Sequence, residues 1–365
     1  MGILDFLYVH FPVSGVDTWV FVPPLVAFIV STLTSMGGVS GAFLLLPFQV
    51  SFLHFTSPSV SSTNFVFNIV AIPSGVYRYL KEGRMAWPLT WVVIVGTLPG
   101  VFIGYYLRIL YLPDPKAFKF FVGCVLLYIG VRLLYEMTAR SQRGKKEMKA
   151  LEDKFNAHVK KLKEAHKERL AAEARLSMDT EAGAVPLSGA AMSGSSPASK
   201  SPRRGGLSAG LPREAKVRTI SWSLSRVEYE FWGQRFSFST VGMFVLALIV
   251  GIIGGTYGIG GGAIIAPFCV AVFHLPVYTV AGAALLGTFI TSVAGVFFYS
   301  VIPAKAGMVV APDWLLGFLF GAGGFAGMYC GARLQKFVPQ KYLKLILGII
   351  ITFLAGSYIL QYFIR

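Results

Sequence analysis

Residues 239–274 read STVGMFVLALIVGIIGGTYGIGGGAIIAPFCVAVFH, and this stretch decides the fold. It holds an apolar run long enough to cross a bilayer, a glycine-rich break, and a second apolar run that is too short to cross one, since a helix rises about 1.5 Å per residue through a core about 30 Å thick. Irregular backbone at membrane depth is tolerated only inside protein or beside a water-filled cavity. The glycines are therefore expected in the interior of a membrane protein.

The composition extends this interpretation to the whole chain. Of its 365 residues, 55% are hydrophobic and 14% are charged, and no Asp, Glu, Lys or Arg lies between Asp17 and Arg78 or between Arg235 and Lys305. A soluble domain would need more polar residues to cover its surface. The sequence predicts an all-α polytopic protein with spans at 19–38, 59–79, 88–107, 117–137, 239–256, 277–299, 314–332 and 342–363. The first run is expected to stay in the protein as a span rather than serve as a secretory signal.

The two halves of the chain repeat one another. The equivalent pairs are Gly41 and Gly261, Pro47 and Pro267, Phe48 and Phe268, His54 and His274, Gly75 and Gly295, and Tyr79 and Tyr299. We expect two homologous repeats, 1–137 and 237–365, each with about four transmembrane helices and one short broken or re-entrant helix. Re-entrant short segments would make the repeats parallel and spanning ones would make them inverted. The acidic start of the chain favours inversion.

A basic insert, residues 138–236, separates the repeats and carries most of the Lys and Arg behind the net charge of +16. The positive-inside rule explains this charge and places the insert in the cytoplasm of a protein of the inner cell membrane, without nucleic acid. Apolar residues at helical spacing predict an amphipathic helix at 140–176, and small residues predict a disordered linker at 177–213. The insert could contact anionic lipid, recruit a cytoplasmic partner or act only as a solvated linker. Homo-oligomerisation stays open.

The glycine-rich breaks are candidate anion sites. Free backbone N–H groups at a helix N-terminus can replace the water of an anion, and glycine lets the anion approach closely. This hypothesis assigns substrate binding to Gly38 and Gly41 in the first repeat and to Gly260, Gly261 and Gly262 in the second. Tight helix packing is the alternative role of such glycines.

Uncharged polar side chains follow each break in the next span. They are Thr63, Asn64 and Asn68 in the first repeat, and Thr288, Thr291 and Ser292 in the second. We expect them to contribute to substrate binding, with interhelical hydrogen bonding as the alternative. Pro47 and Pro267 lie inside the short segments, where each removes a backbone donor and predicts a kink.

Titratable residues in the apolar regions are few. His54 and His274 end the two short segments, where a role in proton coupling competes with a role as interfacial side chains bonded to carbonyls. Arg78 is the candidate to attract an anion at the mouth. Cys124, Cys269 and Cys330 lie far apart in apolar segments, which predicts neither disulfides nor a metal site. The sequence offers no catalytic set and no cofactor motif, so enzymatic activity is not expected.

The second break resembles the signature of the TauE/SafE sulfite exporter family, also called the 4-toluene sulfonate uptake permease family. The residues that carry the likeness are the run YGIGGGAIIAP at 257–267 and Gly282, Thr291, Ser292 and Gly295, with a weaker copy at 37–84. The likeness covers about 19–137 and 239–363 and omits the insert. It implies secondary transport of sulfite, thiosulfate or organosulfonates. Ser40, Ala283 and Ala284 depart from the family pattern and make the two half-sites unequal.

The leading hypothesis is therefore a secondary transporter for a small sulfur-containing anion. An ion or proton gradient would drive it, because the sequence holds no phosphate-binding loop that ends in Lys-Ser or Lys-Thr. An anion channel is the first alternative, and a membrane scaffold that recruits a partner through the insert is the second. Substrate, direction and coupling ion stay open at this point.

Overall fold

The structure is a computed structural model that describes residues 7–36, 40–81, 85–135, 217–231, 234–305, 307–334 and 340–364, with Glu164 and Glu168. The expected amphipathic helix at 140–176, apart from those two residues, and the expected linker at 177–213 lie outside this range. Gly38 lies outside it as well.

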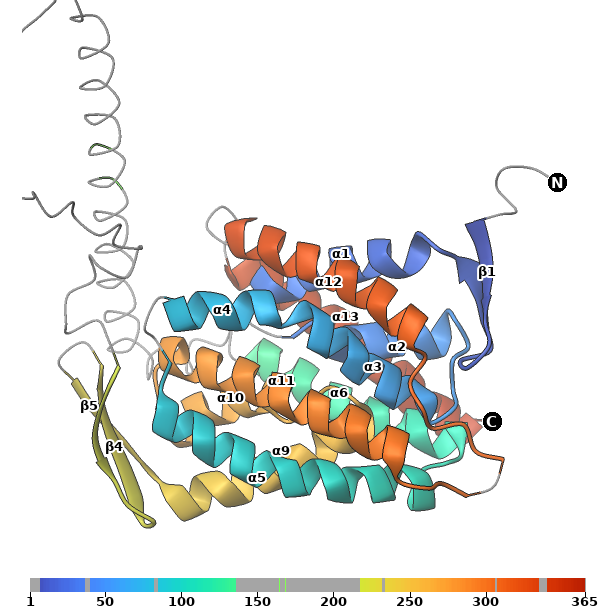
Figure 1. Ribbon diagram of the computed structural model, residues 1–365. Coiled ribbons are helices and arrows are strands. Elements are labelled where there is room, and N and C mark those ends of the chain that lie inside the picture. Colours follow the sequence, from blue (N-terminus) through green and yellow to red (C-terminus); the bar gives the residue numbers. More distant parts are fainter. Residues whose placement is uncertain are drawn as a thin grey trace, which may run out of the picture.

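The chain is mainly helical (Figure 1). The helices of the first half are α1 (Val22–Met36), α2 (Ala42–Ser51), α3 (Ser59–Ala71), α4 (Pro73–Lys81), α5 (Trp87–Tyr106), the π-helix η2 (Leu107–Tyr111) and α6 (Pro115–Tyr135). Those of the second half are α9 (Thr240–Tyr257), α10 (Gly262–Val272), α11 (Val277–Val301), α12 (Trp314–Leu334) and α13 (Gln340–Ile364). Six are long and apolar enough to cross a membrane, namely α5 with η2, α6, α9, α11, α12 and α13. This is a multi-pass membrane protein.

Two of the eight predicted spans differ from the expectation. The predicted span at 59–79 is two helices, α3 and α4, with Pro73 at the first position of α4. Proline lacks the N–H that would continue the ladder, so the break falls at this residue. The helix α1 has 15 residues, fewer than a full crossing needs.

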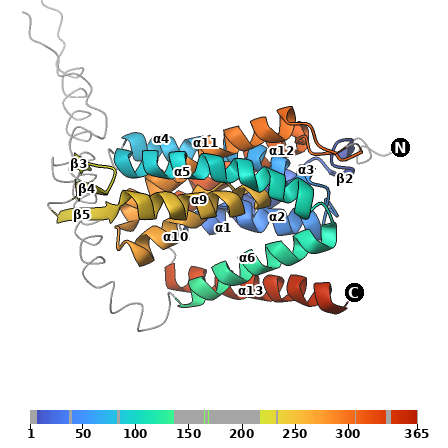
Figure 2. The ribbon, with the colours of Figure 1, turned by 90° about the horizontal axis from the view of Figure 1, so that it is seen from below.

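The two halves pack through one another rather than side by side. The helix α1 packs against α12 and α5 packs against α9, while α3 contacts α12 and α11 contacts α5. The remaining long helices, α6 and α13, pack together along one side of the bundle (Figure 2). Small residues bring two of these pairs close. A Cβ on Gly100 of α5 would lie 2.8 Å from the Cα of Gly251 of α9, and one on Gly327 of α12 would lie 3.0 Å from the Cα of Phe28 of α1.

Short antiparallel strands lie at opposite ends of the bundle (Figure 1). The hairpin of β1 (Tyr8–Phe11) and β2 (Val16–Trp19) precedes α1, and the sheet of β3 (Arg218–Trp222), β4 (Arg226–Phe231) and β5 (Gln234–Ser239) precedes α9. The helices α1 and α9 therefore start from opposite ends. The sequence did not predict these strands, and the three-stranded sheet occupies the end of the segment expected to be insert.

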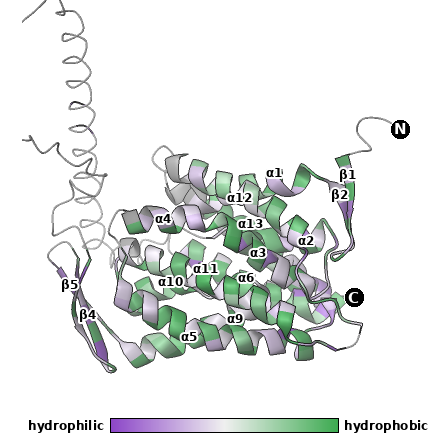
Figure 3. Ribbon diagram, viewed as in Figure 1, coloured by the Kyte–Doolittle hydropathy of each residue, from purple (hydrophilic) through white to green (hydrophobic). Residues whose placement is uncertain are grey.

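The sheet β3–β5 is anchored to the helices by its apolar face. Val227, Tyr229 and Phe231 alternate with less buried residues along β4, and the hydroxyl of Tyr229 lies 2.9 Å from that of Thr279 on α11. Burial raises the pKa of Tyr229. Figure 3 shows hydrophilic residues concentrated on this sheet and hydrophobic ones along the helices.

Arg108 is a buried charge rather than a surface charge. Its side chain is fully buried, its guanidinium donates to the carbonyls of Leu112 and, at 3.4 Å, Thr56, and it lies 3.7 Å from the centre of the Phe118 ring. It therefore caps the end of the α5–η2 helix.

Candidate functional site

The second glycine break forms the start of α10. Gly258 and Gly260 have φ of 85° and 74°, in the left-handed region that favours glycine. Gly261 is the N-cap residue of α10, and no side chain caps this helix. A Cβ on Gly262 would collide with the Ala284 carbonyl and the Thr288 hydroxyl. The start of α10 thus packs so closely against α11 that a side chain at Gly262 would not fit between them.

The first glycine break forms the start of α2 in the same way. Gly41 is the N-cap residue of α2, and the N–H of Ala42 after it donates to Oγ of Ser40 at 3.4 Å. The nearest polar group is Ser31 of α1, whose Oγ lies 2.9 Å from where a Cβ on Gly41 would be. Gly41 and Ala42 are buried. Both short helices therefore start in the protein interior, α2 with Ser40 bonded to its first N–H and α10 without a side-chain cap.

The helix α3 links the two breaks. Nδ2 of Asn64 donates to the carbonyl of Ala42 at 3.2 Å, and Nδ2 of Asn68 donates to the carbonyl of Ile259 at 3.1 Å. Both asparagines are fully buried. Residues four apart lie on one face of a helix. A single face of α3 therefore contacts the start of α2 through one amide and the turn before α10 through the next.

The other predicted polar residues fall into two groups. Ser292 has a buried Oγ without a partner among the described residues, 3.2 Å from where a Cβ on Gly260 would be. Thr288 and Thr291 are buried, and their hydroxyls donate within α11 to Ala284 at 2.8 Å and Gly287 at 2.7 Å. Ser292 and Thr288 thus lie beside the second break.

Thr63 contacts the start of α12. Its Oγ1 accepts the N–H of Asp313 at 2.9 Å, at the start of α12. Asp313 is 3% exposed, and its carboxylate accepts from Ser14 in the turn of the N-terminal hairpin and from the N–H of Leu316. The hydroxyl of Thr63 therefore bonds to the start of α12 rather than to those residues of the glycine breaks that the structure describes.

The long helices α6 and α13 donate hydrogen bonds to the carbonyls of the prolines in the two short helices. The carbonyl of Pro47 accepts from the hydroxyl of Tyr358 on α13 at 3.1 Å, and the carbonyl of Pro267 accepts from the guanidinium of Arg132 on α6. The helix α13 thus contacts α2 of the first half, and α6 contacts α10 of the second half. The chemistry of the two contacts differs although their positions correspond.

His54 and His274 adopt the same unusual backbone conformation. Their φ angles are 53° and 54°, and they are the non-glycine residues with positive φ among those described. The N–H of Phe55 donates to the carbonyl of Gln49 at 3.0 Å, and that of Leu275 donates to the carbonyl of Cys269 at 3.2 Å, so the chain turns back onto each short helix in the same way. Both histidines are exposed. The backbone of Arg78 belongs to α4, and its side chain lies outside the description.

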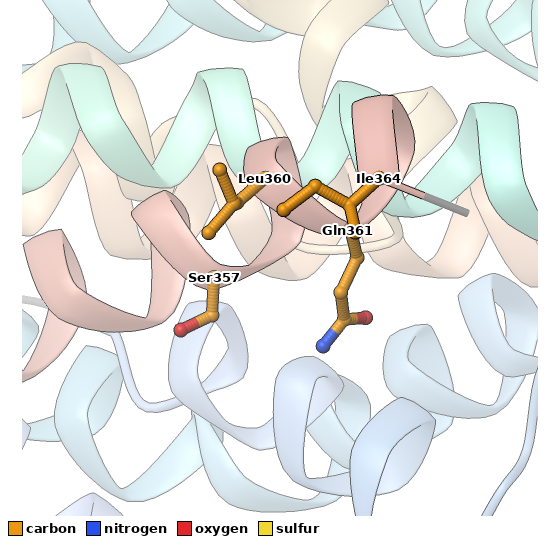
Figure 4. A pocket seen from close by; sticks show the side chains of 4 residues that line it. All are labelled: Ser357, Leu360, Gln361 and Ile364. Carbon is orange, nitrogen blue, oxygen red and sulfur yellow. The ribbon is translucent and has the colours of Figure 1, made fainter.

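Two surface hollows lie away from the breaks. One, of about 340 Å³, is lined by Ser357, Leu360, Gln361 and Ile364 of α13 (Figure 4). The other, of about 220 Å³, lies between the start of α6 and the end of α13. Neither contains a predicted binding residue. Among the residues that the structure describes, no cluster of His, Cys, Asp and Glu could hold a metal ion.

Sequence reasoning missed several buried polar residues beside the breaks. Ser31 and Tyr257 contact the first short helix, and Gln49 within α2 has both amide atoms buried without a partner among the described residues. Gln49 could have been found as the one amide in an otherwise apolar short segment. Ser31 gave no such signal, because serines are common in membrane helices.

The comparisons with known proteins decide the family. Residues 24–358 match the family described as Sulfite exporter TauE/SafE. The chain belongs to the TauE/SafE family. This TauE/SafE protein is also 32% identical over 106 residues to the Probable membrane transporter protein YdhB of Bacillus subtilis (strain 168), a stretch covering 28% of the chain and 37% of that protein.

A second relative is similar over a longer stretch of the TauE/SafE protein. The Probable membrane transporter protein YunE of the same organism is 26% identical over 161 residues, covering 42% of the chain and 56% of YunE. The matches thus span between about a third and about half of each relative. No solved structure matches the chain.

Proposed function

We propose that this chain is a secondary transporter that moves a small sulfur-containing anion, such as sulfite, thiosulfate or an organosulfonate, across the membrane. The starts of α2 and α10 would hold the anion by backbone N–H groups. One observation carries the proposal: Asn64 and Asn68 join both glycine breaks to one face of α3. Membership of the TauE/SafE family supports it.

The burial of the site favours a carrier over a channel. Asn64, Asn68 and Ser292 are fully buried, and Thr288 is 1% exposed. A conducting pore would keep such groups in contact with water, whereas a carrier passes through a closed state. We therefore assign this conformation to an occluded state of an alternating-access cycle.

The proposed orientation has inverted repeats with the insert in the cytoplasm of an inner-membrane protein. It rests on α1 and α9, which begin beside strands at opposite ends of the bundle (Figure 1). Reciprocal packing of α1 on α12 and of α5 on α9 supports a two-fold relation between the halves. Lys and Arg of the insert would obey the positive-inside rule in this orientation.

The test is uptake by purified protein in liposomes, with a panel of sulfite, thiosulfate, sulfate, sulfonates and carboxylates. Uptake that saturates and responds to an imposed proton or ion gradient is expected, and linear uptake without saturation would indicate a channel. Gly261→Val should abolish uptake, because a Cβ there already approaches Cγ2 of Thr97 to 2.6 Å. The matched control is Gly356→Val on α13, where nothing lies within 4 Å and uptake should persist. Wild-type uptake by Gly261→Val would remove support for the site.

A further inference from the structure

Polar atoms without partners surround the two breaks. Among the described residues, Oδ1 of Asn64, Oδ1 of Asn68 and Oγ of Ser292 are buried and make no hydrogen bond. An unpaired buried polar atom costs about 1–3 kcal/mol, so a group that is absent here is expected to contact these atoms when the site is in use.

The orientation of the two amides is fixed by their partners. Each Nδ2 faces a backbone carbonyl, that of Ala42 or that of Ile259. Reversing either amide would point its oxygen at another oxygen, which is repulsive. Each Oδ1 shares a carbon atom with its Nδ2 and therefore lies beside the same break. Each asparagine therefore presents an unpaired acceptor oxygen to whatever enters the site, beside the second N–H of its Nδ2.

The site thus combines two kinds of group. The starts of α2 and α10 offer backbone N–H donors to a negative charge, and Asn64 and Asn68 offer unpaired amide oxygens, which accept. Ser292 can serve as either. A ligand made of acceptor oxygens alone would bind the N–H groups but leave both amide oxygens facing its own negative charge.

From this combination we infer that the site selects an anion that also carries a hydrogen-bond donor. The negative oxygens would lie at the helix starts, and an O–H or N–H of the same molecule would donate to Oδ1 of Asn64 or Asn68. The donor could be the O–H of a singly protonated oxyanion or a substituent of an organosulfonate. This inference rests on the proposed transport function and narrows its substrate class.

The first test compares matched anions in liposomes that contain the full chain. Phosphate and sulfate share a tetrahedral shape, but near neutral pH only phosphate carries O–H groups. Of 2-hydroxyethanesulfonate, 2-aminoethanesulfonate and ethanesulfonate, only the last lacks a donor. Donor-bearing members should be taken up about tenfold to hundredfold faster than their partners. If phosphate is preferred over sulfate but the three sulfonates are taken up equally, the donor is the O–H of a protonated oxyanion. If only the sulfonates differ, the donor is the substituent of an organosulfonate.

Three outcomes of this comparison count against the inference. Equal uptake of donor-bearing and donor-free anions overturns it while leaving transport itself intact. Absence of uptake for every anion of the wider panel overturns the transport proposal and the inference together. A requirement for sodium without any preference among the anions would assign the amide oxygens to a cation and overturn the inference as well.

The second test removes the acceptors. Asn64→Leu and Asn68→Leu keep the approximate size of the side chain and delete Oδ1. The preference for donor-bearing over donor-free anions should therefore fall to about threefold or less, even if the uptake rate falls as well. Gln361→Leu makes the same chemical change at an exposed position of α13 and should leave the preference unchanged. If a variant is too unstable to transport, ligand-dependent thermal unfolding in detergent gives the same comparison. A preference that survives in both asparagine variants refutes the assignment.

Discussion

The hydroxyl of Tyr257 donates a 2.8 Å hydrogen bond to the backbone carbonyl of Phe43. Phe43 lies four residues before Pro47, which has no N–H, so its carbonyl has lost the partner that a regular helix would supply. Tyr257 ends α9 at the second glycine break, whereas Phe43 belongs to α2 beside the first. This hydrogen bond thus joins the two halves and replaces the donor that Pro47 lacks.

Tyr257→Phe should destabilise the protein by about 1–3 kcal/mol, because it leaves a buried carbonyl unpaired. Thermal or denaturant unfolding in detergent measures the loss. Pro47→Ala restores an N–H to the α2 ladder, so the same tyrosine change should cost much less in that background. An equal cost in both backgrounds would show that the carbonyl is not the reason.

Arg108→Met should destabilise by a similar amount of about 1–3 kcal/mol, because the carbonyls of Leu112 and Thr56 lose their donor. Arg108→Lys should recover only part of it, since an ammonium lacks the planar fork that reaches both oxygens. Unfolding in detergent is the measurement. Lys116→Met removes a nearby exposed charge and should change stability by less than about 0.5 kcal/mol.

Asp313→Asn should release the N-terminal hairpin from the end of the bundle. The carboxylate accepts from both the N–H and the hydroxyl of Ser14, and an amide nitrogen in that position would face two donors. Hydrogen exchange of the backbone amides in residues 8–19 should accelerate about tenfold. His10→Gln alters an exposed pair with Asp17 on the same hairpin and should leave exchange near wild type. Unchanged exchange in Asp313→Asn would mean that other contacts hold the hairpin.

Alkaline pH should weaken the attachment of the sheet β3–β5. Burial raises the pKa of Tyr229, so the folded protein resists ionisation that the unfolded chain undergoes near pH 10. The stability contributed by this shift is fully present below about pH 10 and declines above it. Tyr229→Phe should lower stability at pH 8 by about 1 kcal/mol and should reduce the further loss between pH 9 and 11. Parallel alkaline curves for both proteins would contradict this.

The long helices could be predicted closely from the sequence. The predicted spans at 277–299, 314–332 and 342–363 begin and end within a few residues of α11, α12 and α13, because apolar length alone sets such boundaries. The break at Pro73 was visible in the sequence and was overlooked. The strand β4 carried the alternation RVEYEF, but its position in a charged insert concealed the period-two pattern.

The backbone breaks of the candidate site could be predicted from the sequence, but the hydrogen-bond partners of its side chains could not. Repetition of the glycines and prolines indicated the two breaks, because these residues act through local conformation. Roles such as those of Thr63 and Tyr257 depend on segments that lie far away in the chain, Asp313 and Phe43 respectively. Such pairings follow from tertiary packing, which no single stretch of sequence specifies.

The exchanged packing of the two halves has a consequence for biosynthesis. As the ribosome delivers the first half, α1 and α5 enter the bilayer before the neighbours that cover them, α12 and α9, have been made. The nascent chain must therefore be kept from aggregating in the lipid until its own C-terminal portion arrives. A truncated product that ends within the insert would leave the faces of α1 and α5 that pack against α12 and α9 without their partners, and it should be a substrate for membrane quality-control proteases.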